Sequence, residues 1–118
     1  MKKLKRIGFF KELSYGDPEA ASIVESKNKL DRNLVENIVT YLDSGVLFTA
    51  STGLSRDFFD NKVTIGTLGV LTDGHWAWST DLSYYVRKFK VALPADFLEY
   101  MENNKWNHGD VTIEELEF

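Results

Sequence analysis

Two pairs of aspartates beside aromatic side chains are the residues best suited to acid–base chemistry in this sequence. Asp57 and Asp60 lie on either side of two phenylalanines, and Asp73 and Asp81 lie on either side of a segment with two tryptophans. A glycosidase needs two carboxylates about 5–10 Å apart across a cleft, and an indole ring beside them suits a sugar. One open reading is therefore a small-ligand or carbohydrate-binding protein, or a hydrolase that uses paired carboxylates. Against catalysis, the chain holds 18 acidic residues, a turn explains Asp73 and a helix start explains Asp81.

Most other catalytic and cofactor templates are missing from the sequence. The chain has two histidines, His75 and His108, and no cysteine, which argues against a His-based triad, a His-rich metal site and any thiolate chemistry. Gly-x-Ser-x-Gly, the Walker loop and the dinucleotide fingerprint are all absent. Arg56, which follows Gly53 by three residues, offers a grip for an anion. We expect no cofactor and no metal, and catalysis is the less favoured class of function.

The aromatic residues at positions 76–85 have the composition of an interface. Trp76 and Trp78 precede a helix in which Tyr84 and Tyr85 are neighbours. A helix buries only one stripe of side chains, so one of these tyrosines should lie outside the core. Exposed Trp and Tyr with an arginine nearby are typical of binding hot spots. The predicted partner- or ligand-binding residues are Trp76, Trp78, Asp81, Tyr84, Arg87 and Arg56.

Composition places the chain among ordinary globular proteins. Its 118 residues, 43% apolar and 27% charged, suit a single domain over 1–118. The net charge of −4 argues against a nucleic acid as the partner, although five of the 14 basic residues lie within positions 2–11. No apolar run reaches the ~20 residues of a membrane span, and Lys11 and Glu12 interrupt the apolar start. We expect a cytoplasmic protein whose partner is another protein and not a membrane.

A β-hairpin is the strongest local pattern. Two apolar runs meet at Asp73-Gly74, a dipeptide that favours a two-residue type I′ turn. Such a turn pairs Gly69 with Trp78, so that Gly69 leaves room for the indole. It also places Trp76 and Trp78 on one face of the hairpin, directly before the helix that carries the two tyrosines.

The remaining elements must hold this hairpin in place. Stripes of apolar residues predict helices over 31–45, 79–89 and 94–103, the first of which ends at Gly45. Residues that favour β structure predict strands over 4–13, 46–51, 63–65 and 111–118, with a loop over 54–62. Intermixed helices and strands with hairpin connections predict an α+β fold, a small mainly antiparallel sheet with about three helices packed on it. Residues 14–29 and 103–110 stay unassigned.

One stretch also carries a resemblance. Positions 72–86 read Thr-Asp-Gly-His-Trp-Ala-Trp-Ser-Thr-Asp-Leu-Ser-Tyr-Tyr-Val, and Val-Ala-Leu-Pro follows at 91–94 with Phe97 beyond it. This resembles a family of small uncharacterised bacterial proteins with the pattern T-D-G-x-W-x-W-x-x-D-L-x-Y-Y-V, then V-x-L-P-x-x-F. In size and acidity the chain is also similar in style to the immunity proteins of bacterial toxin systems, which are small α+β domains that bind a partner toxin. That likeness implies a non-enzymatic protein-binding module with a basic partner.

Overall fold

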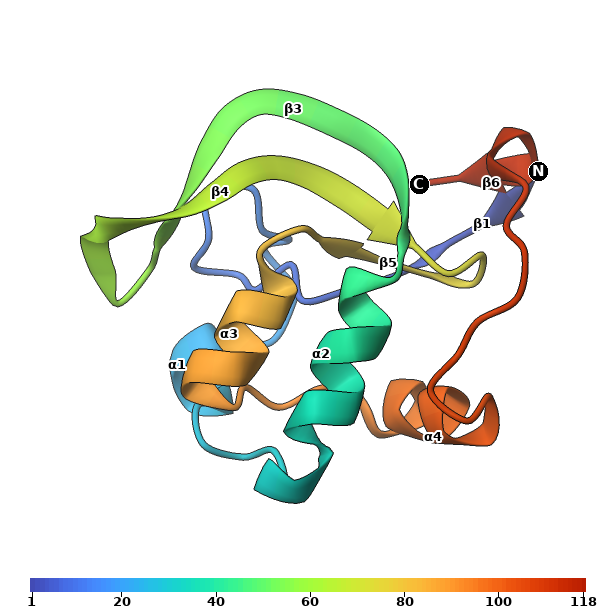
Figure 1. Cartoon of the computed structure of the whole chain (residues 1–118). Helices are drawn as coiled ribbons and strands as arrows, with labels where there is room; N and C mark the ends of the chain where they lie inside the picture. The colour runs from blue at the N-terminus through green and yellow to red at the C-terminus, as the bar shows by residue number, and fades with distance from the viewer.

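Strands and helices separate into two layers in the computed structural model, which describes residues 1–118 (Figure 1). The main sheet has the strand order β2-β5-β4-β3, in which β2 runs parallel to β5 and the other pairs are antiparallel. Its strands are β2 (Lys5–Ile7), β3 (Val46–Asp57), β4 (Asp60–Thr72) and β5 (Trp76–Ser79). Short β1 (Lys2–Lys3) and β6 (Leu116–Glu117) form a separate parallel pair. The predicted α+β fold with a mainly antiparallel sheet is confirmed.

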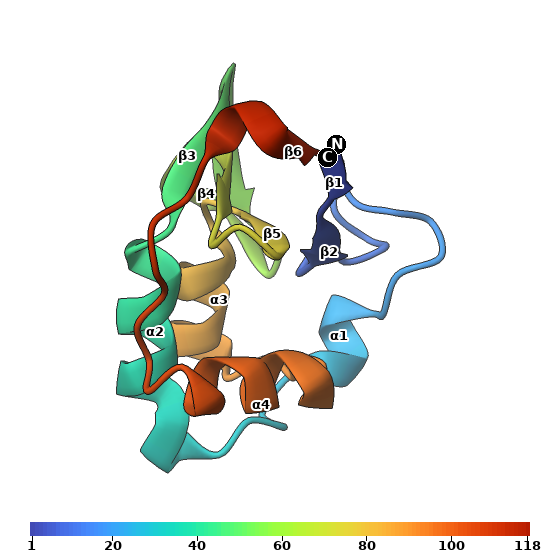
Figure 2. The same cartoon turned by 90° about the vertical axis from the view of Figure 1, so that its right-hand side faces the viewer.

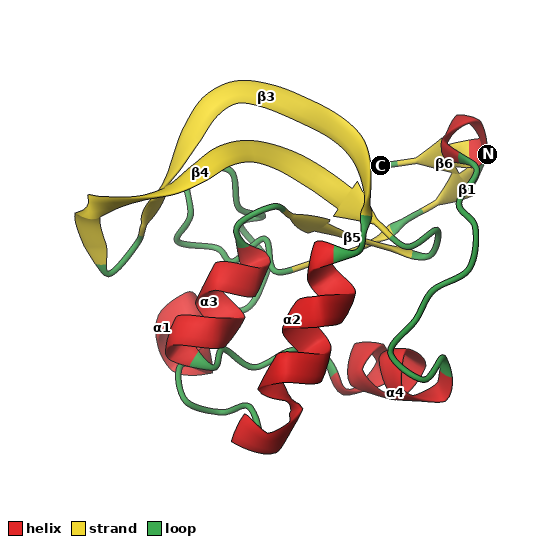
Figure 3. Ribbon diagram, viewed as in Figure 1, coloured by secondary structure: helices red, strands yellow, loops and turns green.

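All four α-helices lie on one side of the main sheet (Figures 1 and 3). They are α1 (Ile23–Ser26), α2 (Val35–Asp43), α3 (Leu82–Phe89) and α4 (Ala95–Asn103), and single 3₁₀ turns cover Arg32–Leu34 and Ile113–Glu115. The three longer helices match the three predicted from apolar stripes. Each buries the expected face, since Ile38 and Leu42 of α2, Tyr85 of α3, and Phe97 and Met101 of α4 are fully or almost fully buried.

The helix layer and the sheet meet at the indole of Trp78, which has no exposed surface. Its ring centroid lies 6.1 Å from that of Tyr41 on α2 and 5.8 Å from that of Phe97 on α4. Its Nε1 donates a hydrogen bond to the carbonyl oxygen of Leu42, 3.2 Å away, near the end of α2. One side chain of the central strand β5 therefore contacts two helices at once.

The hairpin between β4 and β5 has a longer loop than the sequence predicts. The prediction of a two-residue turn is wrong, because Thr72 pairs with Ala77 and four residues, 73–76, separate this pair; the last of them, Trp76, is the first residue of β5. Side chains stabilise this loop: Asp73 Oδ1 accepts hydrogen bonds from the backbone N–H groups of His75 at 2.9 Å and Trp76 at 2.7 Å. The register moves by two residues, so each side chain keeps its expected face.

The β3–β4 hairpin is much longer than predicted and forms an arched arm (Figure 1). Strand β3 does not end at Thr52-Gly53 but continues to Asp57, and the predicted loop over 54–62 supplies both strands and the tight turn at Phe58-Phe59. Register shifts interrupt the β3–β4 pairing at several points. Only Val70–Thr72 of β4 pair with β5, so most of the arm is a two-stranded ribbon.

The two ends of the chain contain less strand than predicted. Within the predicted strand 4–13, only Lys5–Ile7 pair with the main sheet. The predicted strand 111–118 contains a 3₁₀ turn and the two residues of β6. The unassigned segment 14–29 holds the short helix α1, and Ser22 caps it by accepting a hydrogen bond from the N–H of Glu25 at 3.3 Å. Both ends of the chain meet where β1 lies beside β6 (Figure 2).

Gly45, and not Gly69, leaves room for Trp78. A Cβ atom built on Gly45 would lie 2.7 Å from Cζ2 of Trp78 and 3.0 Å from Cβ of Leu71. A Cβ atom on Gly69 would instead meet the carbonyl oxygen of Thr49, at 3.0 Å. The helix α2 must pass this close to β5 because the hydrogen bond from Trp78 to the end of α2 fixes their separation.

Gly45→Ala should therefore destabilise the protein by about 1–3 kcal/mol, the usual cost of overpacking a core. Gly109→Ala is the matched control, since nothing lies within 4 Å of the Cβ position there and neither glycine has a positive φ. Urea denaturation of both variants measures the difference. Equal stability of the two variants would show that the contact between α2 and Trp78 is not tight.

Candidate functional site

Trp76 and Trp78 lie in the core, so the expectation that their rings are accessible is wrong. Trp76 is 5% exposed and Trp78 is fully buried. The reason is the strand order: β5 is an inner strand between β2 and β4, and helices cover the face to which both rings point. The Trp76 ring packs on Phe97 of α4 at a centroid distance of 5.0 Å. A sugar-binding platform built on these two rings is not available.

The other predicted site residues divide into two groups. Arg87 lies on the exposed face of α3 and forms an ion pair with Glu36 of α2, at 2.7 Å. Asp81 and Tyr84 lie at a second place, where the far end of the arm lies against the beginning of α3. Arg56 takes part there only through its backbone carbonyl, since its guanidinium is exposed and donates to the carbonyl oxygen of Asn61 at 3.5 Å. As predicted, only one of the neighbouring tyrosines lies in the core: Tyr85 is buried and Tyr84 is half-buried.

We call this second place the carboxylate corner, and define it as residues 55–57 of β3, residues 81–88 around α3, and Tyr15. Asp57 is buried there, and its Oδ2 accepts hydrogen bonds from the Tyr84 hydroxyl at 2.6 Å and from Lys88 Nζ at 3.4 Å. Its Oδ1 accepts from the N–H of Phe59 at 2.7 Å. Burial alone would raise the pKa of Asp57, but these donors outweigh it and lower the pKa below its ordinary value.

Asp81 has the opposite electrostatic environment. Its Oδ2 accepts hydrogen bonds from the Ser55 hydroxyl, at 2.5 Å, and from the Tyr15 hydroxyl. Its Oδ1 is buried without a partner. Asp81 occupies the N-cap position of α3, yet its side chain caps no backbone N–H. Burial raises the pKa of Asp81 to about 7.

A cavity of about 310 Å³ opens beside the carboxylate corner. Glu12, Tyr15, Ser55, Arg56 and Phe58 are among its lining residues. Asp57 is also among the lining residues, but its side chain is 0% exposed and both of its oxygens accept hydrogen bonds, and Asp81 does not line the cavity. Hydrolysis by a carboxylate pair needs both groups in contact with substrate. Here the two aspartates hold the arm to the helix layer, and small-ligand binding elsewhere on the chain stays a prediction.

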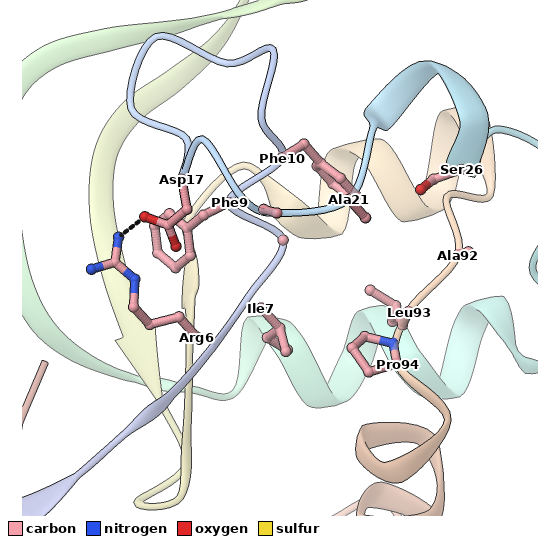
Figure 4. A pocket seen from close by; sticks show the side chains of 12 residues that line it. Arg6, Ile7, Phe9, Phe10, Asp17, Ala21, Ser26, Ala92, Leu93 and Pro94 are labelled. Atoms are coloured by element: carbon pink, nitrogen blue, oxygen red, sulfur yellow. Dashed lines mark hydrogen bonds and ion pairs between the residues drawn. The ribbon is translucent and has the colours of Figure 1, made fainter.

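Arg6 is a feature that the sequence did not single out. Its guanidinium carbon lies 4.7 Å from the ring centroid of Phe9 and 4.0 Å from that of Phe118, and one of its nitrogens donates to Asp17 Oδ1 at 2.9 Å. Three cavities border it, with volumes of about 370 Å³, 270 Å³ and 560 Å³ (Figure 4 shows the first). The sequence contains a basic N-terminal cluster, but no local pattern links Arg6 to a ring at the other end of the chain.

The arm carries most of the exposed large apolar side chains. On β3 and its turn, Leu47 is 54% exposed, Leu54 is 58% exposed and Phe58 is 40% exposed. Strand β3 is also the last strand of the sheet, so its outer edge has no neighbouring strand. The exposed apolar side chains of this surface could not be predicted, because the sequence pattern of 54–62 indicates a loop and not two paired strands.

Metal-ligand clusters and membrane-spanning helices are both absent. No three or more His, Asp or Glu side chains lie close enough together to hold a metal ion, and none of the helices is both long and apolar enough to cross a bilayer. Comparisons of the chain with protein-family models, with curated proteins and with solved structures found no match.

Asp81→Asn should remove a pH dependence of stability. The pKa of Asp81 is about 7 in the folded chain and about 3.9 in an unfolded one. Between pH 4 and pH 7 the carboxyl group is therefore protonated in the folded state and ionised in the unfolded state. The free energy of unfolding therefore falls as pH rises from about 4 to about 7, by at most ~4 kcal/mol, and the loss is complete above pH 7. Urea denaturation at pH 5 and pH 8 should show this fall in the parent and not in the variant.

Asp43→Asn, which alters an exposed carboxylate on α2, is the control and should keep the parent's pH profile. The lowered pKa values of Asp57 and Glu12 act only at more acidic pH, where both groups gain protons. Parallel profiles for the parent and Asp81→Asn would contradict a change of ionisation at Asp81 in this interval.

Proposed function

We propose that this chain is a non-enzymatic protein-binding module, immunity-like in character, that recognises a basic partner protein through the β3–β4 arm. The observation that carries the proposal is the arm itself, with a free strand edge and three exposed apolar side chains. Bacterial origin belongs to the same proposal and rests on the resemblances in the sequence, and a cytoplasmic location is proposed with it from the cysteine-free composition.

The free edge of β3 supports binding of a protein. Native edge strands are commonly protected from other chains by charges or proline, yet no charged residue and no proline occurs in 46–55. The backbone groups along an edge can pair with an extended segment of another chain, and alternate side chains then add specificity. Leu47 and Leu54 lie along this edge strand, and Phe58 lies at the turn that ends it.

The charge distribution supports a basic partner. Residues 95–118 contain seven acidic residues and one lysine, so this segment has a charge of −6 while the rest of the chain sums to +2. All seven carboxylates are on exposed residues: Asp96, Glu99, Glu102, Asp110, Glu114, Glu115 and Glu117. Helix α4 and the segment that follows it lie on the side of the molecule that faces the viewer in Figure 2. A one-signed field of this kind accelerates association with an oppositely charged protein.

Leu54→Asp should weaken binding to the partner at least tenfold, because a charge replaces an apolar contact at the centre of the edge. A photo-crosslinking residue placed at position 54 in cells identifies the partner, and titration of the two purified proteins then measures its affinity. Val24→Asp is the matched control: Val24 is 53% exposed on α1, away from the arm. It should leave the affinity unchanged.

Affinity for the identified protein should also fall steeply with salt. Three results would contradict the proposal: crosslinks from position 54 only to a second copy of this chain, equal affinity of the Leu54→Asp and Val24→Asp variants, or a partner that binds without salt dependence. Circular dichroism and urea denaturation confirm that both variants fold.

A further inference from the structure

The guanidinium of Arg6 is held in a fixed orientation. It lies against the rings of both Phe9 and Phe118, whose centroids are 5.5 Å apart. Guanidinium groups bind aromatic faces through cation–π attraction and stacking, and the contact restricts their rotation. A fixed guanidinium loses little conformational entropy when it binds a ligand.

Most hydrogen-bond donors of Arg6 are unused. A guanidinium has five N–H donors, and the side chain of Arg6 makes one hydrogen bond, to Oδ1 of Asp17. The Arg6 side chain is 34% exposed, so the remaining donors are not sealed in the core. Planar, bidentate pairing with a carboxylate is the interaction that such a free edge favours.

One of the three cavities that border Arg6, of about 270 Å³, suits an anion. Asp17 lines the other two, but no acidic side chain lines this one, in which Arg6 is the only residue with a charged side chain. Its other walls are of two kinds: the apolar side chains of Phe9, Leu68 and Val70, and the hydroxyl-bearing Tyr15, Thr49 and Ser51. Its volume of about 270 Å³ lies just below the range of about 300–1,000 Å³ for most ligand sites, so only a small ligand fits.

Ser79 gives an independent indication of a ligand. It lines the same cavity, it is 1% exposed, and its Oγ has no hydrogen-bond partner. A buried hydroxyl without a partner costs free energy, and native structures contain few such groups. A ligand with a polar atom in this cavity would supply the missing partner.

We propose that the cavity between Arg6 and Ser79 is a binding site for a small organic monocarboxylate with an apolar body. The carboxylate pairs with the free edge of the Arg6 guanidinium, and the body lies against Phe9 and Val70. A single arginine with no second cation matches one planar negative charge better than a phosphate dianion. This site goes beyond the protein-binding function, because it uses the face of the arm next to Phe9 and Phe118 and not the free backbone edge of β3.

Titration with benzoate, followed by backbone amide NMR shifts, tests the site. Benzoate should bind with a Kd on the order of 1 mM, as expected for a ligand of this size, and should shift the amides of Gly69, Val70 and Ser79. Benzamide, which has the same shape without the charge, should bind at least tenfold more weakly. Arg6→Gln should remove benzoate binding, whereas Arg87→Gln, an exposed arginine on α3, should leave it unchanged.

A second variant keeps the test decisive if Arg6→Gln does not fold. Ala50 pairs with Gly69 across the arm and both line the cavity, so Ala50→Phe should fill the space and block benzoate while Arg6 stays in place. Equal shifts with benzoate and benzamide would overturn the proposal, as would benzoate binding that both Arg6→Gln and Ala50→Phe retain. Inorganic phosphate that produces the same shifts more strongly than benzoate would overturn the assignment to a carboxylate.

Discussion

The burial of one indole determines how the two layers of this protein fit together. Trp78 lies on an inner strand, and its ring contacts Tyr41 and Phe97, which belong to different helices. Its Nε1 adds a hydrogen bond to the Leu42 carbonyl near the end of α2, which also accepts one from the N–H of Gly45 at 3.2 Å. An indole is a large apolar group with one polar atom, so a single position provides both extensive burial and a directional bond. Gly45 is required because the helix must come this close.

A second constraint recurs in three places: a buried aspartate that accepts hydrogen bonds from hydroxyl groups of another element. Asp73 accepts from Tyr41 at 2.5 Å, Asp57 accepts from Tyr84, and Asp81 accepts from Ser55 and Tyr15. Each aspartate lies just outside a helix or at a turn, so each bond joins a loop to the packed layers. Burying a carboxylate is costly unless its oxygens are bonded. Asp57 and Asp73 have partners on both oxygens, whereas Asp81 lacks one. The donors around Asp57 lower its pKa, while burial raises the pKa of Asp81.

The helices could be predicted from sequence because their causes are local. The stripe of Leu82, Tyr85 and Val86 repeats at helical spacing and is buried as that spacing implies. The hairpin register could not be predicted, since Asp73 stabilises a longer loop in place of the two-residue turn that Asp-Gly favours. Trp76 and Trp78 are buried because β5 has a neighbouring strand on each side. The sequence around the two tryptophans does not encode this strand order. Arg6 and Phe118 meet only because the ends of the chain lie together.

The arm combines an exposed edge with a firmly attached end, and this combination favours recognition of a partner. At the turn, the N–H of Phe58 donates to the Tyr85 hydroxyl at 3.0 Å, and that hydroxyl donates to the carbonyl oxygen of Arg56 at 3.2 Å. Of the two adjacent phenylalanines, Phe59 attaches the turn to α3 by packing on Phe89 with centroids 4.5 Å apart, while Phe58 is 40% exposed and free to contact a partner. The other end of the arm is paired into the sheet. A ribbon attached at both ends loses little entropy when a partner binds, so its few apolar side chains can contribute most of their contact energy to affinity.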